Sequence, residues 1–178
     1  MNAKAKILYD QNIDDFGHLD PDQIMGLTIY GEARSESREG RVAVGTVILE
    51  RVDKQGWMGK TIEEVCFMPY QFSCFLPGDP NRDMLKRTAD NWNAYYRGSR
   101  PLMECYAVAR GLIEGTIARD PDLASVHCCQ YVTSKYRTDT DAKWNAETNP
   151  VKKDRTDAGR WWARMKRFRI IGAHEFYV

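Results

Sequence analysis

One stretch of the sequence limits the fold more than any other, and it reads GRVAVGTVILERV from Gly40 to Val52. Its apolar residues cover more than one face of a helix; they are Val42, Ala43, Val44, Val47, Ile48 and Leu49. A helix that is apolar on several sides is a buried one. We therefore predict a central helix from about Ser37 to Val52, which the rest of the chain must surround.

Helix-start signals place further helices around it. DPDQ at Asp20–Gln23 combines an N-cap aspartate, a proline at the first helical position and a glutamine that reaches back. Thr61 and Glu64 form a second capping box. Two longer stretches, Arg82–Arg97 and Pro101–Thr116, also have helical patterns, and Gly115 closes the latter.

Three other stretches predict a small sheet. Residues 68–80, with aromatic side chains between prolines, indicate a strand or hairpin followed by a turn at Pro77–Pro80. Residues 125–133 alternate in polarity as a strand does, and residues 166–178 close the chain in a similar way. The polar stretch 134–160 has no period, so we expect a long surface loop. The sum is a mostly helical α+β domain with a small antiparallel sheet.

Length and composition limit the number of domains and the kinds of partner that the chain can have. The 178 residues correspond to one domain, which we expect to span residues 20–178 after an N-terminal extension of residues 1–19. The net charge of +1 gives no sign of a nucleic-acid partner. Neither a signal peptide nor a membrane span is evident, so we expect synthesis in the cytoplasm and no stable membrane insertion.

Glu32 is the candidate for acid–base chemistry. It stands at the end of one helical pattern, between Tyr30 and Ala33, just before the predicted buried helix. Burial raises the pKa of a glutamate, and glycosidic cleavage needs a carboxylic acid that is protonated near neutral pH. The alternative is an ordinary solvated residue at a helix end.

The cysteines offer two other chemistries. Five cysteines are an odd number and do not suggest a disulfide framework. Cys128 or Cys129 beside His127 could form a thiol nucleophile, although neighbours on a strand point to opposite faces. A zinc site from His127, Cys128, Cys129 and His174 lacks the usual paired ligand spacing. Buried thiols are the favoured interpretation.

Four ordered motifs resemble the SleB/CwlJ-type cell-wall hydrolases. These stretches are TIYGEARSES with GRVAVGTVILERV, then TIEEVCFMPYQFSC, HCCQYVT and WWARMKRFRIIGAHEFYV. The resemblance covers nearly the whole chain from Asp22, and four motifs in order are more specific than any one. The chain departs from the family pattern at Ser35, at Glu50, and at Cys128 and Cys129.

The resemblance implies a lysozyme-like fold, related to lytic transglycosylases, that acts on peptidoglycan glycan strands. Glu32 matches the catalytic glutamate of the family. Around it we expect substrate-binding residues from the other motifs, namely Gln71, Phe72, Ser73, His127 and Tyr131. Phe72 could equally belong to the core, and the Tyr131 hydroxyl could steady the transition state.

The number of carboxylates favours a lytic transglycosylase. Hydrolases normally use two carboxylates, and only Glu32 matches a family carboxylate; Glu36, Asp79, Asp139 and Asp141 are unmatched candidates for a second. A single glutamate can form 1,6-anhydromuramic acid between N-acetylmuramic acid and N-acetylglucosamine. The alternatives are a hydrolytic muramidase, a thiol-dependent amidase or endopeptidase, and a non-catalytic peptidoglycan-binding virion module.

No metal or cofactor is expected for this chemistry. A single small catalytic domain resembles a phage endolysin, which accumulates in the host cytoplasm and reaches the cell wall once the membrane is permeabilised. We expect such a protein to act as a monomer on peptidoglycan.

Overall fold

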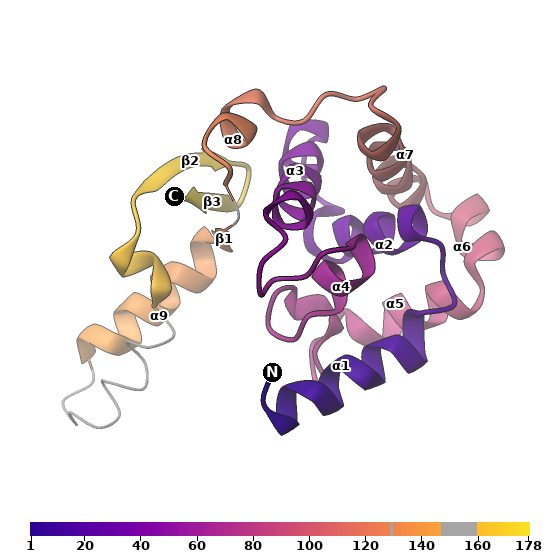
Figure 1. The fold of residues 1–178 in the computed structure, drawn as a ribbon, viewed down its shortest axis with the longest axis horizontal. Helices are drawn as coiled ribbons and strands as arrows, with labels where there is room; N and C mark the ends of the chain where they lie inside the picture. The colour runs from indigo at the N-terminus through magenta and orange to yellow at the C-terminus, as the bar shows by residue number, and fades with distance from the viewer. Residues whose placement is uncertain (129, 147–159) are drawn as a thin grey trace.

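The computed structural model describes residues 1–128, 130–146 and 160–178. The helices are α1 (Ala3–Phe16), α2 (Pro21–Ala33), α3 (Arg38–Lys54), α4 (Ile62–Phe67), α5 (Arg82–Asp90), α6 (Trp92–Gly98), α7 (Arg100–Glu114), α8 (Pro121–Ser125) and α9 (Ser134–Ala146), with 3-10 turns η1 (Ser73–Phe75) and η2 (Trp161–Arg164). The strands are β1 (Gln130–Thr133), β2 (Arg167–Ile171) and β3 (His174–Tyr177). Helices α1 to α7 gather on one side, and the sheet with α8 and α9 lies on the other (Figure 1). The predicted mostly helical α+β class is confirmed.

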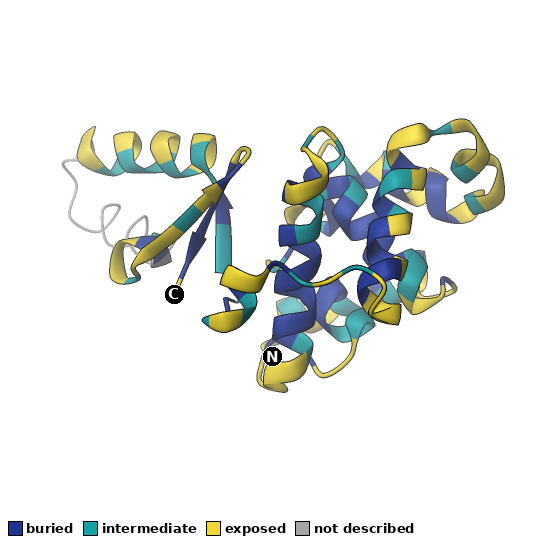
Figure 2. Ribbon diagram, turned by 90° about the horizontal axis from the view of Figure 1, so that it is seen from above, coloured by how far each residue is buried: buried dark blue, intermediate teal, exposed yellow. Residues whose placement is uncertain are grey.

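Helix α3 is the predicted central helix. It packs against α2, α4 and α7 on one side and against α8 and β2 on the other. Its N-cap is Ser37, whose Oγ accepts a hydrogen bond from the Gly40 amide at 3.3 Å. Strand β3 and most of α2 and α3 are buried, whereas β2 is largely exposed (Figure 2). The two halves of the molecule therefore share α3 as a common wall.

The sheet is antiparallel in the order β1-β3-β2, so β1 is an edge strand. Tyr131 pairs with Phe176, and Thr133 pairs with His174. Since successive side chains alternate between the two faces, these four residues share one face. Phe176 on that face belongs to the same buried cluster as Ala43 and Val47 of α3. The packing against α3 thus fixes which face of β1 turns toward the helical half.

Helix α1 is part of the packed structure. The Phe16 ring is fully buried, and its centroid lies 6.0 Å from that of Phe67 and 5.1 Å from that of Phe75. Asp15 forms an ion pair of 2.6 Å with the guanidinium of Arg82 in α5. Residues 1–19 therefore contribute to the core. The division of the chain into an N-terminal extension (residues 1–19) and a catalytic domain (residues 20–178) stays a prediction.

The predicted strand or hairpin at residues 68–80 is wrong. The segment contains a left-handed residue, Tyr70, with φ of 68°, and then the 3-10 turn η1. Successive local hydrogen bonds, such as Leu76 N–H to Ser73 C=O at 2.8 Å, satisfy its backbone without a partner strand. The predicted helix Arg82–Arg97 is likewise two helices, because the chain leaves the helical region at Asn91.

The predicted strand 125–133 is shorter than expected, and the predicted loop 134–160 contains a helix. The chain turns at His127, whose φ is 48°, so that strand β1 begins only at Gln130. Helix α9 was not predicted from the sequence because it has no buried residues and hence no periodic apolar residues. Ion pairs at i,i+4 support it, including Arg137–Asp141 at 3.1 Å, and residues 147–159 lie outside the described chain.

None of the described helices has the length and hydropathy of a membrane-spanning segment.

Candidate active site

Glu32 lies in the last turn of α2, where segments distant in sequence meet its carboxylate. The Cys74 amide of η1 donates a hydrogen bond to Oε1 at 3.3 Å, and the Tyr131 hydroxyl of β1 donates to Oε2 at 3.3 Å. The Glu32 side chain is half-buried. Both carboxylate oxygens are thus held in place, while part of the residue stays open to solvent.

Burial raises the pKa of Glu32 above its ordinary value. The hydrogen bonds from Cys74 and Tyr131 favour the charged form and oppose that rise, and the negative charge of Asp79 adds to it. The carboxyl is therefore placed so that it can hold a proton, and its anion still has two donors once the proton leaves. That combination suits a group that acts first as an acid and then as a base.

An aromatic ring and a cation lie beside the tyrosine that binds this carboxyl. Phe72 is 2% exposed, and its ring centroid lies 6.3 Å from that of Tyr131. The buried Arg51 guanidinium lies 4.9 Å from the Phe72 centroid. Burial raises the pKa of the Tyr131 phenol well above its usual value, so that the hydroxyl stays a donor.

The glycine before Glu32 allows η1 to come close to α2. A Cβ atom on Gly31 would lie 2.8 Å from both Cβ and Sγ of Cys74. Any larger residue would push Cys74 away, and with it the amide that binds Glu32. Gly31 therefore fixes the distance between the acid and its donor.

The structure brings together some of the predicted substrate-binding residues. Tyr131 reaches Glu32 directly, and Ser73 lies exposed next to Cys74. Gln71 is half-buried in the same segment. Phe72, for which stacking on sugar and core packing were both open, is packed in the core.

His127 lies elsewhere, because it is in the turn before β1 and not on the strand face of Tyr131. Its side chain is 81% exposed, and its Nδ1 lies 3.0 Å from Oε2 of Glu50. Glu50, one of the departures from the family pattern, is buried and also pairs with Arg119 at 2.8 Å. The residue at this departure, Glu50, is therefore the partner of His127.

The four candidates for a second carboxylate have different partners in the structure. Asp139 pairs with Lys135 at 2.5 Å, and Asp141 pairs with Arg137 and Arg160. Glu36 Oε2 accepts a hydrogen bond from the Ala173 amide at 3.2 Å. Asp79 is the candidate whose charge acts on Glu32.

The thiol and zinc alternatives gain no support. Burial raises the pKa of the Cys66 and Cys105 thiols to about 12, and that of Cys74 well above its usual value. Thiols in that state are poor nucleophiles. Cys128 is also buried, and Cys129 lies outside the described chain. The described residues contain no group of three or more His, Cys, Asp or Glu side chains suited to a metal ion.

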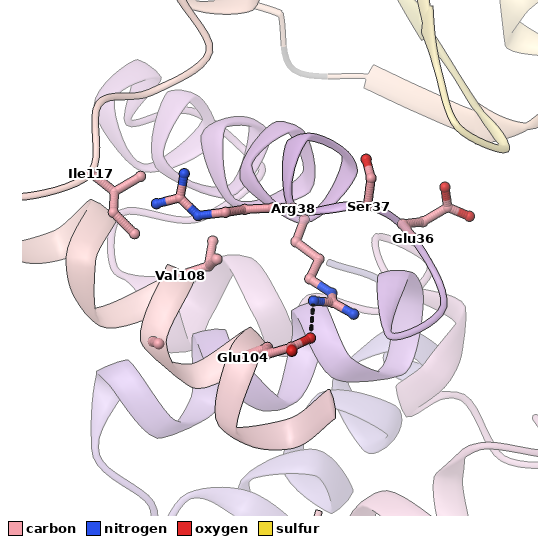
Figure 3. A pocket seen from close by; sticks show the side chains of 8 residues that line it. Glu36, Ser37, Arg38, Glu104, Val108 and Ile117 are labelled. Carbon is pink, nitrogen blue, oxygen red and sulfur yellow. Dashed lines mark hydrogen bonds and ion pairs between the residues drawn. The ribbon is translucent and has the colours of Figure 1, made fainter. Parts of the chain in front are cut away.

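A cavity of about 490 Å³ lies apart from Glu32, between the start of α3 and helix α7 (Figure 3). Ser37 and Arg38 line one side, and Val108 and Ile117 line the other. An ion pair of 2.6 Å joins Arg41 to Glu104 within it. Glu36 is a second carboxylate of this cavity, and it accepts a hydrogen bond from the Ala173 amide.

Two residues were not predicted to lie near this carboxylate, although His174 had been considered as a zinc ligand. Cys74 directly follows the QFS element, so its place in the motif was a usable signal. His174 lies in the IGAHEF ending and is 1% exposed, with its ring centroid 5.1 Å from that of Tyr131. Burial lowers the pKa of His174, so its imidazole is neutral near pH 7 and packs against the tyrosine that binds Glu32.

Comparison with known proteins decides the family. Residues 35–177 match the family described as Cell Wall Hydrolase. The chain belongs to the cell wall hydrolase family. The match begins just after Glu32, so the role of that residue rests on the geometry around it.

One relative of this cell wall hydrolase is the spore cortex-lytic enzyme of Oceanobacillus iheyensis. The two are 35% identical over 77 residues, which are 41% of this chain and 28% of the relative. The chain thus aligns with little more than a quarter of that relative. No solved structure matches, so the likeness to lysozymes stays a prediction.

Proposed function

We propose that this cell wall hydrolase cuts the glycan strands of peptidoglycan between N-acetylmuramic acid and N-acetylglucosamine, as a lytic transglycosylase. The observation that carries the proposal is the half-buried Glu32 carboxyl, with its raised pKa and its two donors from Cys74 and Tyr131. Family membership and the name of the spore cortex-lytic relative support peptidoglycan as the substrate.

Glu32 serves in both halves of the reaction. Protonated Glu32 gives its proton to the glycosidic oxygen as the bond from muramyl C1 to that oxygen breaks. The resulting carboxylate, stabilised by the Cys74 amide and the Tyr131 hydroxyl, takes the proton from the muramyl C6 hydroxyl. The C6 oxygen bonds to C1, which closes the 1,6-anhydro ring, and Glu32 ends protonated. The attacking oxygen belongs to the reacting sugar, so the step has the entropic advantage of an intramolecular reaction.

A hydrolytic muramidase is the second candidate. Asp79 favours it, since its charge reaches Glu32 and a second carboxylate could activate a water molecule. Its Oδ1 accepts a hydrogen bond from the Asn81 amide at 2.8 Å, which holds the carboxylate in one orientation. The Asp79→Asn variant therefore separates the two candidates: it abolishes a muramidase but leaves a transglycosylase active.

Mass spectrometry of products formed in ¹⁸O-labelled water tests the proposal. Purified peptidoglycan digested by the wild-type protein should yield anhydro-muropeptides without label at muramyl C1. Label at C1 in most products identifies a muramidase, and cut peptide stems with intact glycan refute both candidates.

The biological setting that we propose is bacteriolysis of the endolysin type, in which the protein meets the wall after the membrane is permeabilised. Turbidity clearing of membrane-permeabilised cells, compared with intact cells, tests this setting. Equal clearing of intact cells would contradict it.

A further inference from the structure

A cavity of about 310 Å³ lies between the loop after α3 and the start of β1. We call it the Trp57 cavity; its walls include Lys54, Trp57, Met58, His127, Gln130 and Met165. Figure 1 shows this loop on the side of the helical half that faces the sheet. The cavity thus lies where the two halves of the molecule meet.

The exposure of Trp57, which lines this cavity, is unusual for a tryptophan, because 70% of the residue is accessible to solvent. Tryptophan is buried in most proteins, and an indole left in water gives up the gain of burying its large apolar surface. Lys54 and Gln130 add polar groups to the same cavity. An exposed indole face beside polar side chains matches a sugar ring, which has apolar CH faces and a polar edge.

Strand β1 contributes neighbouring residues to the Trp57 cavity and to the contacts of Glu32. Neighbouring residues of a strand point to opposite faces. Tyr131 turns toward Glu32, whereas Gln130 turns toward Met58 and places its Nε2 3.9 Å from the Met58 sulfur. The backbone step between the two residues is only about 3.8 Å. The Trp57 cavity and Glu32 therefore lie on opposite faces of β1, and a polymer cut at Glu32 would reach the cavity by passing around the edge of this strand.

The edge of β1 supports the same path. Within the described sheet β1 pairs with β3 on one side, and its other side carries no strand. Edge strands present amide and carbonyl groups that accept new partners. N-acetyl groups of amino sugars carry one amide donor and one acceptor each, so they suit such an edge.

We propose that the Trp57 cavity is a saccharide subsite, in which the Trp57 indole stacks on an N-acetylated sugar of the glycan strand and Lys54 and Gln130 bind its polar edge. This subsite rests on the proposed function, since it lies along the strand that Glu32 cleaves. His127, predicted as a substrate-binding residue, lines this subsite and not the site of cleavage.

Binding of a defined oligomer of N-acetylglucosamine, measured by calorimetry on the Glu32→Gln background, tests the subsite without any cleavage. Trp57→Ala should weaken binding about tenfold, as the loss of a buried aromatic anchor typically does. Trp57→Phe, which keeps an aromatic face, should lose less. Tyr95→Ala is the matched control, because Tyr95 is a partly exposed aromatic residue on α6.

Equal affinity of Trp57→Ala and the control overturns the subsite, as does an oligomer that fails to bind the parent protein. The subsite is also overturned if a stem peptide binds at Trp57 and the sugar oligomer does not displace it. In the active protein, Trp57→Ala should raise KM for peptidoglycan and leave kcat nearly unchanged. A failure of the proposed cleavage would show as inactive wild-type protein, whereas a failure of the subsite shows in these binding constants.

Discussion

Removal of the Tyr131 hydroxyl should shift the pH dependence of activity. The hydroxyl donates to Oε2 of Glu32 at 3.3 Å and stabilises the charged carboxylate. A hydrogen bond to a charged group contributes about 1.5–3 kcal/mol, and this distance is at the long end, so we take about 1.5 kcal/mol. Since one pKa unit corresponds to about 1.36 kcal/mol, Tyr131→Phe should raise the pKa of Glu32 by about one unit.

The assay is release of soluble fragments from dye-labelled peptidoglycan, measured from acid to mildly alkaline pH. Glu32 must be protonated to donate, so the alkaline limb of kcat/KM should move up by about one unit in Tyr131→Phe. Phenylalanine keeps the ring that packs 5.7 Å from Phe176, so the fold should persist. Tyr177→Phe is the matched control, because its hydroxyl bonds Glu175 on the other face of the sheet. A limb that stays in place or moves toward acid would refute the role of Tyr131.

Three further changes test the packing around the acid. Gly31→Ala should destabilise the protein by about 1–3 kcal/mol and lower activity, since the new methyl displaces Cys74; unchanged urea midpoints and activity would contradict this close approach. Phe16→Ala should cost about 3–5 kcal/mol in urea unfolding, while the exposed Ile7→Ala costs little; equal losses would remove α1 from the core. Glu32→Gln should be at least as stable as wild type at pH 7, because a carboxyl whose folded pKa is raised loses stability as pH rises past its ordinary value of about 4.3. That advantage should vanish in acid below that value, and a variant clearly less stable at pH 7 would argue against desolvation of Glu32.

Local signals in the sequence predicted helix starts well. Ser37 caps α3, and Thr61 Oγ1 accepts from the Glu64 amide at 3.1 Å, as the capping pattern predicts. Gly115 ends α7 in the left-handed conformation. Each of these signals lies within one turn of the residue it controls. Helix α9 lacked such a signal, because ion pairs and not a buried face support it.

The site could be predicted only in part. Glu32 followed from its place before the buried helix and from the family motif. Its donors are 42 and 99 residues away in sequence, so no local pattern could show that Cys74 and Tyr131 meet the same carboxylate. His127 was misplaced because the alternation of residues 125–133 concealed a turn with positive φ.

The Glu32→Gln variant tests the central claim most directly. Glutamine keeps the size of the side chain and one acceptor oxygen in place of the two that Cys74 and Tyr131 bind, but it cannot donate a proton as an acid. With its fold verified by circular dichroism, the variant should release muropeptides from purified peptidoglycan at least about 10²–10⁴-fold more slowly than wild type. Release at a rate near that of the wild-type protein would contradict the account of Glu32 as the catalytic acid.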